Sequence, residues 1–334
     1  MRVSVLIPVF NKAPYLRECL DSVYAQTFKD FEIIAVDDRS TDDSLAILKA
    51  ETDPRLRIIA LAENRGPGGA ANAGLDACRG EYIVRLDADD LAVPERIQWQ
   101  VAFMDAHPEV GASSGALRLF GDNGQIWRLP LTDEACKANL LFGVPVSQGA
   151  SILRRSVVEA HRLRYDAAWP RVGEDWLFWT TMAPTTQFGN IDQVVTLYRR
   201  GEQNISHGQS KVATHRVIMR EVFNMLGIDA SEKDVDTHLM ALTYFAEPPD
   251  PASVRRLRDW LDHLLLLNAE RGLFPKDLFR ARVERAWKDL FYRLPAHGVG
   301  ASLQHLRSSG QWPMDRALYL FKVQLNKLFG RNVR

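Results

Sequence analysis

Short apolar runs alternate with helical patterns over the first hundred residues, and this alternation limits the fold more than any other feature of the chain. The runs are rich in β-branched residues, which is typical of buried strands. They cover residues 3–9, 31–36, 57–61 and 82–86. Because helical segments separate these strands, the pattern predicts an α/β fold with a mostly parallel, doubly wound sheet.

Polar residues follow each of the four runs. They are Asn11, Asp38, Asn64 and an aspartate cluster made of Asp87, Asp89 and Asp90. In an open parallel sheet the carboxyl ends of the strands share one edge, and ligands bind in the crevice outside that edge. We therefore expect four separate loops to converge on one binding crevice.

The aspartate cluster places three carboxylates within four residues, in the stretch "YIVRLDADDLAVPERI". Such a group is repulsive unless something positive lies among the anions. A calcium loop counted from Asp87 would need Gly and Glu where the chain has Ala92 and Gln98. The chemistry favours Mg²⁺ or Mn²⁺, held by one or two carboxylates and completed by water and phosphate oxygens. An acidic turn that caps the next helix is the alternative.

The pattern changes along the chain. A hairpin is expected within residues 115–130, and helices alone are expected after about residue 208. Residues 1–205 carry 22 Lys and Arg against 28 Asp and Glu, whereas residues 206–334 carry 20 against 14. These changes predict an α/β domain over residues 1–208 and an all-helical C-terminal region over residues 209–334.

Cysteine usage and hydropathy bear on location. The three cysteines are scattered, which favours a reducing compartment over a disulfide scaffold. The N-terminus enters a strand without a charged leader, and no apolar run approaches the ~18–20 residues of a spanning helix. We expect a cytoplasmic protein without a signal peptide. No recognised nucleic-acid-binding motif is present, so a nucleic-acid partner is not expected.

Three quoted stretches together resemble a known family. "SVLIPVFNKAPYLRECLDSVYAQTFKDFEIIAVDDRSTDDS", "ENRGPGGAANAGLDACRGEYIVRLDADD" and "GEDWLFW" are similar to an inverting family 2 glycosyltransferase with a GT-A fold, over roughly residues 1–205. The resemblance implies a metal-dependent enzyme of the EC 2.4 class. Such an enzyme would move a sugar from a nucleotide-sugar, most often a UDP-sugar, to a hydroxyl of a glycan or glycolipid in surface polysaccharide synthesis.

The resemblance also implies roles for individual residues. Those implied to bind the nucleotide-sugar are Pro8, Phe10, Asn11, Asp38, Asn64, Asn72 and Asp87. Asp38 would accept a hydrogen bond from the uracil ring, and Asp89 would help to hold Mn²⁺ or Mg²⁺ beside the diphosphate. The family often has Arg before the residue that matches Asn72; Ala71 stands there in this chain, so that phosphate contact is missing.

The acidic pair Glu174 and Asp175 opens the stretch "EDWLFW". Acidic residues at a helix N-terminus are favourable for structural reasons alone. The resemblance implies a general base that takes the proton of the acceptor hydroxyl, with Asp175 at the usual position and Glu174 as the alternative. Trp176 and Trp179 would then stack on the acceptor sugar, or else belong to the core.

Two other functional classes remain as alternatives, and the role of one surface near the C-terminus has two interpretations. A sugar nucleotidyltransferase would need a Gly-rich loop after the first strand, which "PVFNKAP" lacks. A non-catalytic nucleotide-sugar or glycan-binding protein would lack intact metal and base candidates. One apolar helical face near the C-terminus, opposite Lys327 and Arg331, predicts either peripheral membrane contact or packing; it comprises Leu318, Phe321, Leu325, Leu328 and Phe329.

Overall fold

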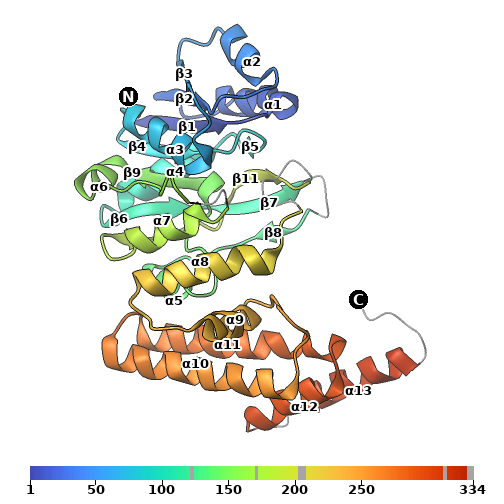
Figure 1. Cartoon of the computed structure of the whole chain (residues 1–334). Coiled ribbons are helices and arrows are strands. Elements are labelled where there is room, and N and C mark those ends of the chain that lie inside the picture. Colours follow the sequence, from blue (N-terminus) through green and yellow to red (C-terminus); the bar gives the residue numbers. More distant parts are fainter. Residues whose placement is uncertain (121–123, 170–171, 202–207, 311–313, 329–334) are drawn as a thin grey trace. The chain divides into compact units, whose positions relative to one another are not determined.

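The chain folds as two compact units, Met1–Gln209 and Ser210–Arg334. The computed structural model describes residues 1–120, 124–169, 172–201, 208–310 and 314–328 (Figure 1). Phe329 of the expected apolar helical face and Arg331, expected opposite that face, lie outside these residues.

A large sheet forms the centre of the first unit, in the strand order β10-β6-β9-β4-β1-β2-β3. Its strands are β1 (Val3–Val9), β2 (Phe31–Asp37), β3 (Leu56–Ala60), β4 (Tyr82–Arg85), β6 (Val110–Ser114), β9 (Ser151–Arg154) and β10 (Gln187–Phe188). β3, β2, β1 and β4 are parallel, whereas β9 runs antiparallel to both β4 and β6. The expectation of a mostly parallel sheet is therefore confirmed, with β9 as the exception.

A smaller sheet in the same unit has the order β5-β11-β7-β8. Its strands are β5 (Leu91–Ala92), β7 (Ala116–Phe120), β8 (Ile126–Trp127) and β11 (Val194–Arg199). β7 and β8 are the two arms of the expected hairpin, whose turn at residues 121–123 lies outside the described residues. β5 follows the aspartate cluster directly and pairs with β11, so this sheet fixes the far side of the cluster.

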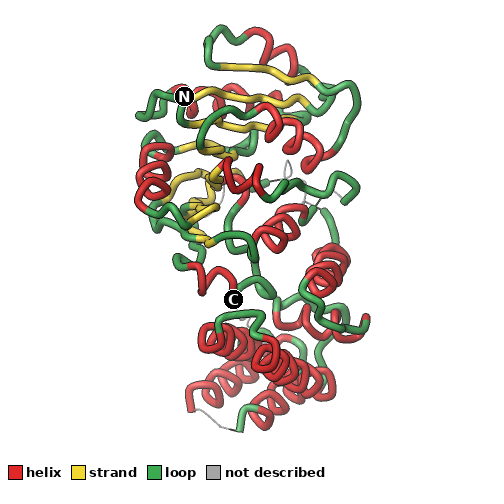
Figure 2. Tube along the Cα trace, turned by 90° about the vertical axis from the view of Figure 1, so that its left-hand side faces the viewer, coloured by secondary structure: helices red, strands yellow, loops and turns green. Residues whose placement is uncertain are grey.

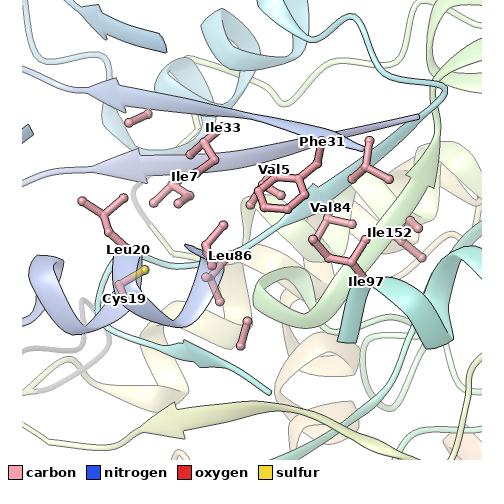
Figure 3. Close-up of a cluster of buried hydrophobic side chains, with 14 of the residues drawn as sticks. Val5, Ile7, Cys19, Leu20, Phe31, Ile33, Val84, Leu86, Ile97 and Ile152 are labelled. Atoms are coloured by element: carbon pink, nitrogen blue, oxygen red, sulfur yellow. The ribbon is translucent and has the colours of Figure 1, made fainter. Parts of the chain in front are cut away.

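Helices cover both faces of the large sheet (Figure 2). Alternate residues of β1, such as Val5 and Ile7, join Leu20 and Ile97 in one buried cluster (Figure 3). On the opposite face the backbone at Gly74 lies so close to the sheet that a Cβ there would meet Leu6 at 2.0 Å. The helices are α1 (Ala13–Tyr24), α2 (Ser44–Ala50), α3 (Gly66–Ala77), α4 (Arg96–Ala106), α5 (Asp133–Ala138), α6 (Arg155–Ala160), α7 (Glu174–Met182) and the 3₁₀ turn η1 (Gln148–Ala150).

Side chains of the loop between β2 and α2 form hydrogen bonds to the loop after β1. Asp43 precedes the helix without a side-chain cap. The Ser40 hydroxyl instead accepts a hydrogen bond from the Asn11 N–H at 3.1 Å, and the Asp42 carboxylate accepts one from the Ala13 N–H at 3.0 Å. These side chains therefore fasten the loop after β1 to the loop after β2.

Helices joined by loops make up the described residues of the second unit, as expected for this region. Its elements are α8 (Lys211–Met225), α9 (Glu232–Ala241), α10 (Pro251–Arg271), α11 (Lys276–Phe291), η2 (Leu294–Ala296), α12 (Val299–Ser308) and α13 (Met314–Leu328). Capping boxes begin α9 at Ser231 and α10 at Asp250, and Gly272 ends α10 with a φ of 64°. No helix within the described ranges combines the length and apolarity that a membrane span requires.

Candidate active site

One cavity of about 590 Å³ lies in the first unit, at the carboxyl ends of the parallel strands. The residues that line it include Pro8, Phe10, Lys12, Asp38, Asn64, Arg85, Asp87, Asp89, Gln148, Glu174 and Asp175. The loops after β1, β2, β3 and β4 therefore converge, and the start of α7 joins them.

Asp38 and Asn64 form one part of the lining. The Asn64 amide donates to an Asp38 carboxylate oxygen at 3.0 Å and to the Asp38 carbonyl at 2.9 Å. The backbone N–H of Arg65 donates to the other carboxylate oxygen at 2.7 Å. These hydrogen bonds orient the Asp38 carboxylate at the cavity.

Asn11 and Asn72 have other partners, and neither is among the residues that line the cavity. Asn11 has a φ of 53°, and its side-chain oxygen accepts the Thr41 N–H at 2.8 Å. The Asn72 amide exchanges two hydrogen bonds with the backbone of Tyr165, at 2.8 and 2.9 Å. Both side chains hold loops that surround the cavity, so their contact with a ligand stays a prediction.

Two cations of the chain lie beside the aspartate cluster. The Lys12 ammonium is 2.6 Å from Asp89 Oδ2, and the Arg85 guanidinium is 3.0 Å from Asp87 Oδ1. Burial raises the pKa of Asp89, and the charge of Lys12 opposes this shift. The sequence pattern predicts a metal ion among these carboxylates, and the structure places the positive charges of Lys12 and Arg85 against two of them.

Asp90 is the buried member of the cluster. One carboxylate oxygen accepts the backbone N–H of Arg199 at 2.8 Å, which ties the cluster to β11. Burial, reinforced by the charges of Asp87 and Asp89, raises the pKa of Asp90 well above its ordinary value. Asp90 therefore positions its neighbours, and it does not line the cavity.

Arg96 fastens the surroundings of the cluster. Its fully buried guanidinium donates to the Arg85 carbonyl at 2.6 Å, the Gly149 carbonyl at 3.1 Å and the Thr196 hydroxyl at 3.1 Å. Burial lowers the pKa of Arg96 to about 10, so the group stays charged at neutral pH. One side chain of α4 thus joins β4, η1 and β11 around the cavity.

The oxygen ligands of the cluster suit a hard divalent cation. Asp89 is 7% exposed on its side chain, and its carboxylate lies at the cavity. Among the described residues no three acidic, His or Cys side chains converge to hold an ion by themselves. Mg²⁺ and Mn²⁺ accept sites with one or two carboxylates when water and phosphate oxygens complete the shell. The residues present therefore fit such an ion when Asp89 exchanges its Lys12 partner for it.

The acidic pair begins α7 directly after Gly173, which has a φ of 92° that suits glycine. Burial, reinforced by the charge of Asp175, raises the pKa of Glu174 to about 7. Burial also raises the pKa of Asp175 to about 6, although the Trp176 N–H donates to its carboxylate at 2.8 Å. Gln148 donates to Glu174 at 3.2 Å. The pair has the proton affinity of a base that works near neutral pH.

Trp176 and Trp179 are both buried, with 7% and 0% exposure, and neither lines the cavity. The Trp176 indole N–H donates to the Leu140 carbonyl at 2.7 Å. Trp179 packs edge-on against Phe178, with ring centroids 5.0 Å apart. These contacts favour the core alternative for both residues and support α7 beneath the acidic pair.

Sequence reasoning missed Lys12, Arg85 and Gln148. A charged residue within a buried apolar strand was a usable signal for Arg85, because such a residue needs a partner nearby. Lys12 follows Asn11 at the strand end and could have been included in the crevice. Gln148 carried no local signal, since its place depends on how η1 packs.

The chain is similar to known glycosyltransferases. The family model described as glycosyl transferase family 2 matches residues 4–162. An uncharacterized glycosyltransferase of Haemophilus influenzae is 30% identical over 249 residues, which cover 68% of this chain and 76% of that protein. The succinoglycan biosynthesis protein ExoO of Rhizobium meliloti is 36% identical over 188 residues, which cover 52% of this chain and 53% of ExoO.

A solved structure shows the fold. The chain of S. aureus TarS 1–349, crystallised in complex with UDP-GlcNAc, has a TM-score of 0.59 and 20% identity, with 100% of this chain and 93% of that chain covered. The α/β sheet and the helical C-terminal part match this GT-A structure. The sheet, the cavity at its strand ends and the similarity over most of a relative's length agree: this chain belongs to glycosyltransferase family 2.

Proposed function

We propose that the chain is an inverting glycosyltransferase that moves a sugar from a UDP-sugar to a hydroxyl of a glycan or glycolipid. One observation carries the proposal: Asp87 and Asp89 of the aspartate cluster line the same cavity as the acidic pair. The carboxylates of the aspartate cluster suit a cation that neutralises the diphosphate, and those of the acidic pair suit removal of a proton from the acceptor hydroxyl. Inverting transfer needs both in one place.

Donor binding is assigned to the loops after β1, β2 and β4. Asp38, held by Asn64, accepts a hydrogen bond from the uracil N–H, while Pro8 and Phe10 form apolar lining beside it. Asp87 contacts the ribose or the sugar. The UDP-GlcNAc complex of TarS, which has the same fold, supports a UDP-sugar as donor.

Asp89 would hold Mn²⁺ or Mg²⁺ in the donor complex. The ion would supply Lewis-acid stabilisation of the charge that develops on the departing diphosphate. This assignment of the ion rests on the carboxylate oxygens of Asp89 and on the position of that side chain at the cavity.

The transfer step is assigned to the acidic pair. Asp175 removes the proton of the acceptor hydroxyl while that oxygen forms a bond to the anomeric carbon. The bond from that carbon to the diphosphate oxygen breaks, UDP leaves with the electron pair, and the configuration inverts. Glu174 keeps its hydrogen bond to Gln148 and is the alternative base.

The biological setting rests on a relative. ExoO is named for succinoglycan biosynthesis, which supports surface polysaccharide synthesis for this chain. The three cysteines are buried free thiols, which supports the cytoplasmic side of the cell. Membership of the glycosyltransferase family favours this function over a sugar nucleotidyltransferase.

A thermal-shift screen tests the donor. UDP-, GDP- and dTDP-sugars are added to the full chain with and without Mn²⁺, because a ligand of the native state raises its melting temperature. A UDP-sugar with Mn²⁺ is expected to give the largest shift. UDP release on addition of glycan acceptors then separates an enzyme from a binding protein. A shift with GDP- or dTDP-sugars alone contradicts the assigned donor.

Membrane contact is part of the proposal for α13. Its exposed apolar residues Met314, Leu318 and Phe321 recur at helical spacing, with 77%, 60% and 63% exposure. Residues 314–334 also carry five Lys and Arg against one Asp, which suits an anionic lipid surface. Cosedimentation with anionic vesicles tests this. Leu318→Ser with Phe321→Ser should release the protein, whereas a wild-type chain that ignores the vesicles contradicts the contact.

A further inference from the structure

The ammonium of Lys12 occupies the carboxylate that a metal ion would need. Lys12 Nζ lies 2.6 Å from Asp89 Oδ2, and the two side chains are only 14% and 7% exposed. Two cations repel each other strongly when they contact the same carboxylate oxygen. Binding of a divalent cation to that oxygen therefore requires Lys12 to leave it.

The net negative charge of the cavity lining indicates a second role for Lys12, as a positive partner for an entering diphosphate. Among the described residues that line the cavity, two are cations, Lys12 and Arg85, and five are acidic, namely Asp38, Asp87, Asp89, Glu174 and Asp175. A diphosphate that enters adds further negative charge to this surplus. Its binding is favourable only when positive charge is placed next to it.

The two cations differ in how firmly they are held. The Arg85 guanidinium donates to the Leu86 carbonyl at 2.9 Å, contacts Asp87 at 3.0 Å and is 5% exposed. The backbone of Lys12 is fixed through its N–H, which donates to the Ser44 hydroxyl at 2.8 Å. Its charge, however, sits at the end of a flexible four-carbon stem. Of these two cations, Lys12 is thus the one whose charge can move while its backbone stays in place.

We propose that Lys12 holds Asp89 in the free protein, yields Asp89 to a divalent cation, and then contacts the diphosphate of the donor. Lys12 is a positioning residue for the metal and a binding residue for the nucleotide. The inference rests on the proposed function, because it takes a nucleoside diphosphate as the ligand of the cavity.

Lys12→Met tests the proposal, because Met keeps an unbranched chain and removes the charge. Calorimetric titrations at pH 8 measure Mn²⁺ alone and then UDP at saturating Mn²⁺. The variant should bind Mn²⁺ about tenfold more tightly, since its competitor is gone, and UDP about tenfold more weakly, since a phosphate partner is gone. A purely structural role cannot produce these opposite changes.

Two further variants serve as controls. Lys12→Arg keeps the charge and should retain weak Mn²⁺ binding. Arg17→Met breaks the ion pair between Arg17 of α1 and Glu51, two residues that are not among those lining the cavity, and should change neither affinity.

The outcomes separate the two proposals. Unchanged or weaker Mn²⁺ binding by Lys12→Met overturns the inference, while UDP binding by the wild type keeps the proposed function. A wild-type chain that binds Mn²⁺ only as weakly as Asp89→Asn also overturns the inference. If the wild type binds no UDP under any condition, the proposed donor fails, and the inference fails with it.

Discussion

Asp87 and Asp89 of the aspartate cluster line the same cavity as the acidic pair, but the two groups have opposite surroundings. Asp87 and Asp89 each contact a cation of the chain, at 3.0 and 2.6 Å. Glu174 and Asp175 form no salt bridge with any described residue and receive neutral hydrogen bonds instead. Their pKa values rise to about 7 and about 6. The difference teaches that carboxylates in contact with a positive side chain suit cation binding, whereas buried carboxylates that receive only neutral hydrogen bonds from described residues suit proton transfer.

Asp175→Asn should give the largest effect. The amide keeps the shape of the side chain but removes the basic oxygen, so transfer should slow by about 10²–10⁴-fold while UDP-sugar affinity survives. Initial rates of UDP release and calorimetric titration measure the two quantities. Glu174→Gln is the control and should be milder. If Glu174→Gln is inactive and Asp175→Asn is active, the base is Glu174.

Asp89→Asn should affect cation binding rather than proton transfer. Loss of this carboxylate should reduce Mn²⁺-dependent UDP affinity by on the order of 100-fold while the fold is kept. Titration of UDP with and without Mn²⁺ measures the change. Equal affinities of variant and wild type in Mn²⁺ would remove Asp89 from the metal site.

Asp38→Ala should weaken UDP binding by roughly 1–3 kcal/mol, the usual cost of losing a charged hydrogen-bond partner. The variant should also lose discrimination between UDP and CDP, because cytosine presents an acceptor where uracil presents an N–H. Competition titrations with both nucleotides measure the ratio. An unchanged UDP-to-CDP ratio places the base elsewhere.

The pH dependence should be the smallest effect. A base must be deprotonated, so the raised pKa values of the acidic pair mean that the transfer rate falls as pH decreases through about 7 to 6. Below that window the rate should drop by about tenfold for each pH unit. Rate profiles between pH 5 and 8 test this. In Asp175→Asn the midpoint should move or disappear, and a profile that keeps its midpoint contradicts the assignment.

Local patterns accounted for most of the fold. The four strands expected in the first hundred residues appear within a residue or so of their expected bounds, since hydrophobic periodicity is a local property. The convergence of Asp38, Asn64 and Asp87 also followed, because strand ends in a parallel sheet share an edge. The small sheet did not follow, since β5 and β8 have two residues each and depend on their partners.

The chain's own sequence therefore determined the α/β architecture, the family and the carboxylates of the cavity. Tertiary structure alone decided what those carboxylates contact. Lys12 contacts Asp89 across 77 positions of the sequence, and Arg199 contacts Asp90 across 109. Arg96 joins the two strands β4 and β11 and the 3₁₀ turn η1. Whether a carboxylate is matched by a cation or left with a raised pKa depends on burial and on neighbours within a few ångströms, and packing brings those neighbours together.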